Sequence, residues 1–144
     1  MVGGKKMDRV LNERLDRIDA SLHNFYESAE MSYKQLVGSL DTASQIFFTP
    51  IGGVINHVTV SWPRGCNFKV EVVFRHKTVQ FIPTPDTGGS GIKGIALDNF
   101  TETLAPSWEV RKNDPIEMHL INHDNAFEHT ISAVVHICGE EIKR

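Results

Sequence analysis

The sequence predicts an α+β protein in which a long N-terminal α-helix of the coiled-coil type precedes an antiparallel β-sandwich of jelly-roll type. Up to residue 40, apolar residues recur at alternating steps of three and four, the spacing of one helix face. From residue 54 onward they alternate with polar residues, the spacing of half-buried strands. We therefore expect a helical segment at 1–46, a junction at 47–53, the sandwich at 54–138 and a tail at 139–144.

A narrow apolar seam runs along the predicted helix. It consists of Leu11, Leu15, Ile18, Leu22, Phe25, Ala29, Tyr33, Leu36 and Leu40. This is a heptad pattern, and a helix with so narrow a seam is not stable alone in water. The seam must pack either against the same helix of other copies or against the β-domain of its own chain. Its width favours self-association, so we expect all of these residues except Ala29 to serve oligomerisation or docking.

The junction and the strands follow from turn residues and alternation. Pro50 stops a helix, and Gly52 and Gly53 allow the chain to turn. We expect strands at 54–61, 68–75, 79–83, 116–121 and 131–137, with weaker ones at 95–103 and 108–111. The glycine-rich stretch 84–94 is expected to be a long exposed loop, which either contacts a partner or has no role.

Composition excludes several classes of function. The net charge is −3 and no basic stripe is present, so we expect no nucleic-acid partner. No apolar run approaches the ~18 residues of a membrane span, and no secretory signal is visible, so we expect a protein made in the cytoplasm with no membrane contact. Cys66 and Cys138 are too few for a disulfide framework and are expected to be free thiols.

The histidines near the C-terminus are the candidates for a metal site. His119, His123, His129 and His136 lie close in sequence, and His123 and His129 flank a turn across which they could approach each other. Two ligands are a weak signal, because a zinc site uses three or four. We therefore expect no metal and no cofactor.

No catalytic motif is present. The sequence contains no nucleophile elbow, no phosphate-binding glycine loop and no His-Glu-x-x-His helix, so we expect a protein that is not an enzyme. Trp62 and Trp108 could stack on a sugar, but tryptophan in a small sandwich more often belongs to the core.

Two resemblances add to this prediction. Residues 110–134, with Asn122-His123-Asp124 and His129-Thr130, resemble the strand, loop and first ligand histidine of cupredoxins. Cys138 follows this segment, but no histidine or methionine comes after Cys138. Blue copper needs two histidines and a cysteine, so the chemistry is missing.

A second resemblance is carried by seven segments of the β-region: 55–60, 63–66, 70–72, 80–83, 95–100, 122–124 and 129–130. With these segments the β-region resembles small β-sandwich virion structural proteins of tailed phages, of the decoration, head-fibre and tail-attachment types. The resemblance implies a homo-oligomer in a virus particle, with other virion proteins as partners and no shared active site. A sandwich that binds a carbohydrate or a receptor is the alternative, and a cupredoxin-like metal protein is the third hypothesis.

Overall fold

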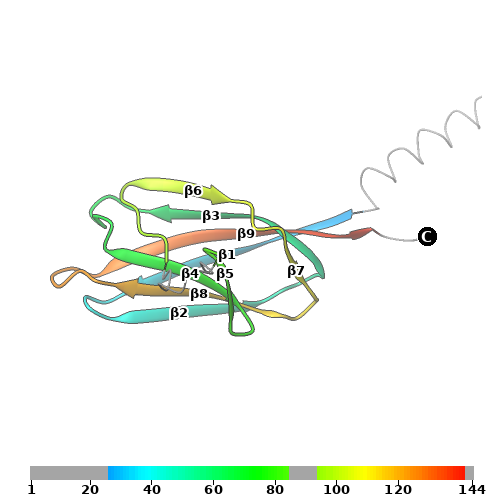
Figure 1. The fold of residues 1–144 in the computed structure, drawn as a ribbon, viewed down its shortest axis with the longest axis horizontal. Coiled ribbons are helices and arrows are strands. Elements are labelled where there is room, and N and C mark those ends of the chain that lie inside the picture. Colours follow the sequence, from blue (N-terminus) through cyan, green and yellow to red (C-terminus); the bar gives the residue numbers. More distant parts are fainter. Residues whose placement is uncertain (1–25, 85–93, 142–144) are drawn as a thin grey trace, which may run out of the picture.

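The computed structural model describes residues 26–84 and 94–141, which form two antiparallel β-sheets packed face to face (Figure 1). The strands are β1 (Tyr26–Val37), β2 (Thr42–Phe48), β3 (Gly53–Trp62), β4 (Val70–His76), β5 (Val79–Ile82), β6 (Phe100–Leu104), β7 (Trp108–Val110), β8 (Pro115–Asn122) and β9 (His129–Glu141). Neither described range contains a helix, so neither contains one that could span a membrane.

The two sheets share the strands unequally. One sheet has the order β1-β9-β3-β6, with β7 also pairing with β3, and the other has the order β2-β8-β4-β5. Consecutive strands β1 and β2 therefore lie at the edges of different sheets. A hydrogen bond from the Lys34 amide to Gln45 Oε1, 2.8 Å long, joins these two edges on one side of the sandwich.

The core lies between the sheets and follows the alternation of the strands. In β8, for example, Ile116, Met118 and Leu120 are fully buried, whereas the residues between them are half-buried. The Trp62 indole donates to the Val70 carbonyl at 3.0 Å, and the Tyr33 hydroxyl donates to the Ile116 carbonyl at 2.8 Å. Both large polar-tipped side chains thus enter the core with their hydrogen bonds made.

The predicted sandwich is confirmed, and the predicted N-terminal helix is wrong where the structure describes it. Residues 26–37 form strand β1, which pairs with β9 along its length, and residues 42–48 form β2. In β1, Met31, Tyr33 and Val37 point into the core, so the segment also satisfies the period of a strand. The predicted seam residues Leu11, Leu15, Ile18, Leu22 and Phe25 lie outside the described residues.

The strands and their connections give the sandwich two different ends. The start of β1 and the end of β9 pair with each other, Tyr26 opposite Glu141, and extend past the other strands (Figure 1). The connections between β1 and β2, between β3 and β4 and between β8 and β9 lie at the opposite end. This opposite end, with its short connections, carries the candidate site.

Candidate functional site: an apolar loop end

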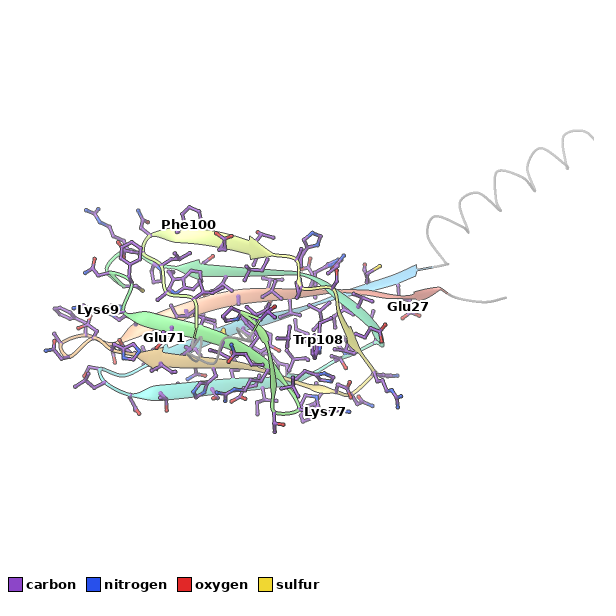
Figure 2. The ribbon with its side chains drawn as sticks, in the orientation of Figure 1. Glu27, Lys69, Glu71, Lys77, Phe100 and Trp108 are labelled. Atoms are coloured by element: carbon purple, nitrogen blue, oxygen red, sulfur yellow. The ribbon has the colours of Figure 1, made fainter. Side chains whose placement is uncertain are left out.

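Three connections and the start of β6 are joined by backbone hydrogen bonds into one surface, which we call the loop end. It comprises residues 38–41, 63–69, 98–100 and 123–128. The Leu40 amide donates to the Asp124 carbonyl at 3.0 Å, and the His123 amide donates to the Lys69 carbonyl at 2.8 Å. In Figure 2, Lys69 and Phe100 lie at this end and Glu27 lies at the other.

Large apolar side chains of the loop end, and one on the adjoining end of β1, are not buried. Their exposed fractions lie between 49% and 69%. We call this set the apolar tip; it consists of Leu36, Leu40, Phe68, Phe100 and Phe127. Single exposed apolar residues are ordinary on a protein surface, but several on adjoining loops are typical of an interaction site.

Two residues of the apolar tip also hold an unfavourable backbone conformation. Leu40 has φ 52° and Phe68 has φ 59°, both in the left-handed region that glycine adopts without strain. For a residue with a side chain this region costs roughly 1–2 kcal/mol. Because neither side chain is buried, the fold gains little from a leucine or a phenylalanine there. Strain of this kind concentrates at functional positions.

A buried side-chain amide is hydrogen-bonded to two of the loops that carry the apolar tip. Asn122, at the end of β8, is almost fully buried, and its Nδ2 donates to the carbonyls of Gly38 at 3.0 Å and Phe127 at 2.9 Å. Its Oδ1 accepts from the Asp124 amide at 2.9 Å. One side chain therefore fixes the loop that carries Leu40 and the loop that carries Phe127.

Two carboxylates complete the bracing of the loops. Asp124 accepts hydrogen bonds from His129 Nε2 at 2.9 Å and from the amides of Ala126 and Phe127. The His129 hydrogen bond, followed by that of the Ala126 amide, holds the pKa of the Asp124 carboxyl below its usual range. Asp98 Oδ1 accepts from the amides of two residues in the 63–69 connection, each at 2.9 Å. The loops are thus held in place before any partner binds.

Cys66 lies beneath the same connection and is fully buried. Burial, followed by the negative charges of Asp98 and Asp124, raises the pKa of its thiol to about 11. Since the thiolate is the reactive form, Cys66 is inert at neutral pH. It belongs to the packing of the loop end and not to its chemistry.

The two predicted metal candidates are hydrogen-bonded to different carboxylates. His123 Nε2 is hydrogen-bonded to Glu71 Oε2, and His129 is hydrogen-bonded to Asp124. Within residues 26–84 and 94–141, no three histidine, cysteine, aspartate or glutamate side chains gather in a way that could hold a metal ion. His123 lies at the loop end, and His129 is the first residue of β9.

The predicted docking residues separate into three groups. Tyr33 is buried in the core. Leu36 and Leu40 belong to the apolar tip, although they come from a strand and a turn instead of a helix. The others precede the described residues.

Sequence reasoning missed the three phenylalanines of the apolar tip. Phe68 and Phe100 each directly follow an asparagine, and Phe127 follows Asn125 by two residues. Turns usually carry small or polar residues, so a phenylalanine inside each turn sequence was the available signal.

A serine–histidine pair on the outer face of the smaller sheet lacks the chemistry of a nucleophile. Ser44 Oγ lies 2.7 Å from both Glu117 Oε2 and His119 Nδ1. The hydroxyl has one proton and the carboxylate can only accept, so the serine donates to Glu117 and His119 Nδ1–H donates to the serine. Burial, followed by the charge of Arg75, lowers the pKa of His119. Because its Nδ1 proton is directed at the serine oxygen, His119 does not act as a base toward Ser44.

His76, beside a cleft of about 620 Å³, has both ring nitrogens hydrogen-bonded. The Trp108 indole donates to His76 Nδ1 at 2.9 Å, so His76 Nε2 carries the proton and donates to Asp114 Oδ2 at 2.7 Å. The Arg111 amide, which donates to the same carboxylate, holds the pKa of Asp114 below its usual range, and His76 adds to this. Neither ring nitrogen of His76 is free to act on a substrate.

The two tryptophans do not form a sugar-binding platform. Trp62 is buried in the core. Trp108 is half-buried, stacks on Phe81 with ring centroids 5.3 Å apart, and uses its N–H on His76. Sugar stacking needs an open ring face, so this placement counts against the carbohydrate alternative.

The sequence matches no protein-family model and no curated protein. Among solved structures, the chain is similar to FLHE, with 11% identity and a TM-score of 0.47 over 78% of this chain and 97% of the other. It is similar to a chain of the Sulfolobus Turreted Icosahedral Virus, with 12% identity and a TM-score of 0.46 over 81% of this chain and 31% of the other. It is also similar to the Yersinia pseudotuberculosis-derived mitogen, with 9% identity and a TM-score of 0.43 over 82% of this chain and 91% of the other. Such values indicate no more than a broadly similar arrangement of strands.

Proposed function

We propose that this chain is a non-enzymatic structural protein of a larger assembly, and that its β-sandwich docks on a partner protein through the apolar tip. The observation that carries this proposal is the pair Leu40 and Phe68, which are exposed and held at positive φ. Exposure and strain both disfavour these side chains in the isolated fold, so binding is the property that accounts for them.

The surroundings of the apolar tip favour a protein as the partner. Two acidic and two basic exposed side chains lie on the connecting loops beside it: Asp41, Arg64, Lys69 and Glu128. Apolar anchors surrounded by charges of both signs are typical of a protein interface. An anionic membrane surface attracts clusters of several lysines and arginines, and this surface has no such excess.

A virus particle is the assembly that we propose, with other virion proteins as partners. The support is the resemblance of the strand and turn segments between residues 55 and 130 to small β-sandwich virion proteins of tailed phages. The shape of the sandwich suits the role, because the apolar tip lies at the end opposite the β1–β9 ribbon and is therefore free to reach a neighbour (Figure 1).

Site-specific photocrosslinking tests the docking proposal. A benzoyl-phenylalanine is placed at Phe68 or Phe127 of the full chain, in cells that make the protein naturally. Val79 is the matched control position, since it is an exposed apolar residue on β5, outside the apolar tip. We expect one adduct of defined mass, containing one partner protein, from both tip positions and none from the control. No adduct at the tip, or the same adduct from residue 79, would overturn the proposal.

A vesicle experiment distinguishes a protein partner from a membrane. The purified full chain is floated with equimolar phosphatidylcholine and phosphatidylglycerol vesicles. We expect the protein to stay at the bottom of the gradient. Flotation that is lost in the Phe68→Ser/Phe127→Ser variant would make the bilayer the target of the apolar tip and refute docking on a protein.

A further inference from the structure

On the side of the sandwich formed by β1 and β2, strand β2 presents backbone groups that have no partner among the described residues. Among the described strands, β2 pairs only with β8, and β1 only with β9. The Thr49 amide donates to Asp114 and the Asp41 carbonyl accepts from Asn122, so the odd-numbered residues of β2 face β8. Alternate residues of an antiparallel strand point their N–H and C=O groups to opposite sides. Ile46 and Phe48 therefore direct their backbone groups away from the sheet.

The edge of β2 carries none of the features that usually prevent pairing. The strand Thr42–Phe48 contains no charged residue and no proline, and its register with β8 has no bulge. Ile46, Phe47 and Phe48 are between 37% and 64% exposed. Phe47 and Phe48 line a shallow groove of about 340 Å³ together with Met31, Ser32 and Pro50.

The opposite edge of the same sheet is built differently. Strand β5 spans only Val79–Ile82 and is followed directly by Pro83. Short edge strands and proline are common ways of blocking edge-to-edge association. The contrast between the two edges of one sheet indicates that β2 is the edge that pairs with a strand of another molecule.

The apolar residues of β2 are self-complementary about a two-fold axis. If two copies pair antiparallel with Phe47 on the axis, Phe47 meets Phe47 of the second copy and Ile46 lies opposite Phe48 of the second copy. Ile46 and Phe48 are the residues whose backbone groups point outward, so this register also lets the two edges exchange hydrogen bonds. Each large apolar side chain then faces another one.

The charged residues of β1 are complementary between two copies related by the same axis. The Tyr33 and Phe47 rings lie 4.9 Å apart, and Lys34 is joined to Gln45, so Ser32 lies beside Phe47 on the axis. Glu30 and Lys34 are exposed and stand two residues to either side of Ser32. A two-fold axis at Ser32 places Glu30 of each copy opposite Lys34 of the other.

We infer that two copies of this chain associate through this side of the sandwich, with β2 continuing the smaller sheet from one copy into the next. The occupant of the edge is a second copy because both the apolar contacts and the charges are self-complementary, as an isologous interface requires. This surface is separate from the apolar tip, so the dimer does not depend on the proposed function.

The first test is the mass of the full chain in solution, measured by light scattering over a range of concentrations. The monomer mass is 16.2 kDa. We expect twice this mass for the natural chain and the monomer mass for Phe48→Lys. Val79→Lys, which puts the same charge on the other edge of the sheet, should remain a dimer. Circular dichroism and the urea midpoint verify that each variant is folded. A monomeric natural chain, or a dimeric Phe48→Lys variant, would overturn the inference.

A charge exchange tests the register. Glu30→Lys or Lys34→Glu alone puts like charges opposite each other at two places in the dimer, and we expect the dissociation constant to rise about tenfold. The double variant restores opposite charges and should restore the natural dissociation constant. A double variant that dissociates as readily as the single ones would refute the proposed axis.

Discussion

Replacement of Tyr33 tests the placement of β1 in the sandwich core. Tyr33→Phe removes the hydroxyl that donates to the Ile116 carbonyl at 2.8 Å, and this should lower the free energy of unfolding by about 1 kcal/mol. Tyr33→Ala also removes the ring, which lies 4.9 Å from the Phe47 ring and 5.7 Å from the Phe74 ring, and leaves a cavity. Truncating a buried aromatic in this way costs about 4 kcal/mol.

Urea unfolding followed by circular dichroism measures both effects. For a domain of this size the denaturant slope is about 2 kcal/mol per molar, so the midpoint should fall by about 0.5 M for Tyr33→Phe and about 2 M for Tyr33→Ala. Leu36→Ala is the control, because Leu36 lies on the same strand with half of its surface exposed, and it should cost less than about 1 kcal/mol. Equal midpoints for Tyr33→Ala and Leu36→Ala would refute the burial of Tyr33 and with it the position of β1.

Two further predictions concern the loop end. The Asp124 carboxyl has a lowered pKa in the folded protein, so the stability that it contributes is present above the unfolded-state pKa near 3.9 and is lost as the pH falls through the lower folded value. When the pH is lowered below about 4, the urea midpoint of Asp124→Asn should therefore fall less than the midpoint of the natural chain. Parallel curves of midpoint against pH for the two proteins would contradict this. Phe68→Gly relieves strain at φ 59° but adds freedom to the unfolded chain, so its free energy of unfolding should stay within about 1 kcal/mol of the natural value. The crosslink from residue 127 to the partner should be lost in the same variant. A large loss of stability would show that Phe68 serves the fold.

Strands β3, β8 and β9 could be predicted from the sequence because each has one buried and one outer face. That arrangement imposes alternation, as in β8, where Ile116, Met118 and Leu120 are buried. The turns between these strands carry proline, glycine and asparagine, which mark strand ends independently of the alternation. Local chemistry and the final fold agree here, so pattern reasoning succeeded.

Residues 26–40 satisfy two patterns at once. Ala29, Tyr33, Leu36 and Leu40 have the spacing of a helix face, while Met31, Tyr33 and Val37 have the spacing of a strand. Local spacing cannot choose between the two, and the choice is made by β9, roughly a hundred residues later in the sequence, which pairs with β1 from Tyr26 to Val37. Tertiary pairing often overrides local preference in this way.

In the candidate site, too, some features could be predicted from the sequence and others came only from the tertiary structure. The sequence by itself identified Leu36 and Leu40 as docking residues, and that role stays a prediction, now with the two side chains placed in the apolar tip. It also identified the turn that His123 and His129 flank. Only the tertiary structure joined Leu40 to Phe68 and Phe127, and only it gave His123 the carboxylate of Glu71, fifty-two residues away. A sequence determines which side chains a turn can carry, whereas hydrogen bonds between loops that are distant in the chain decide which of those side chains share a surface.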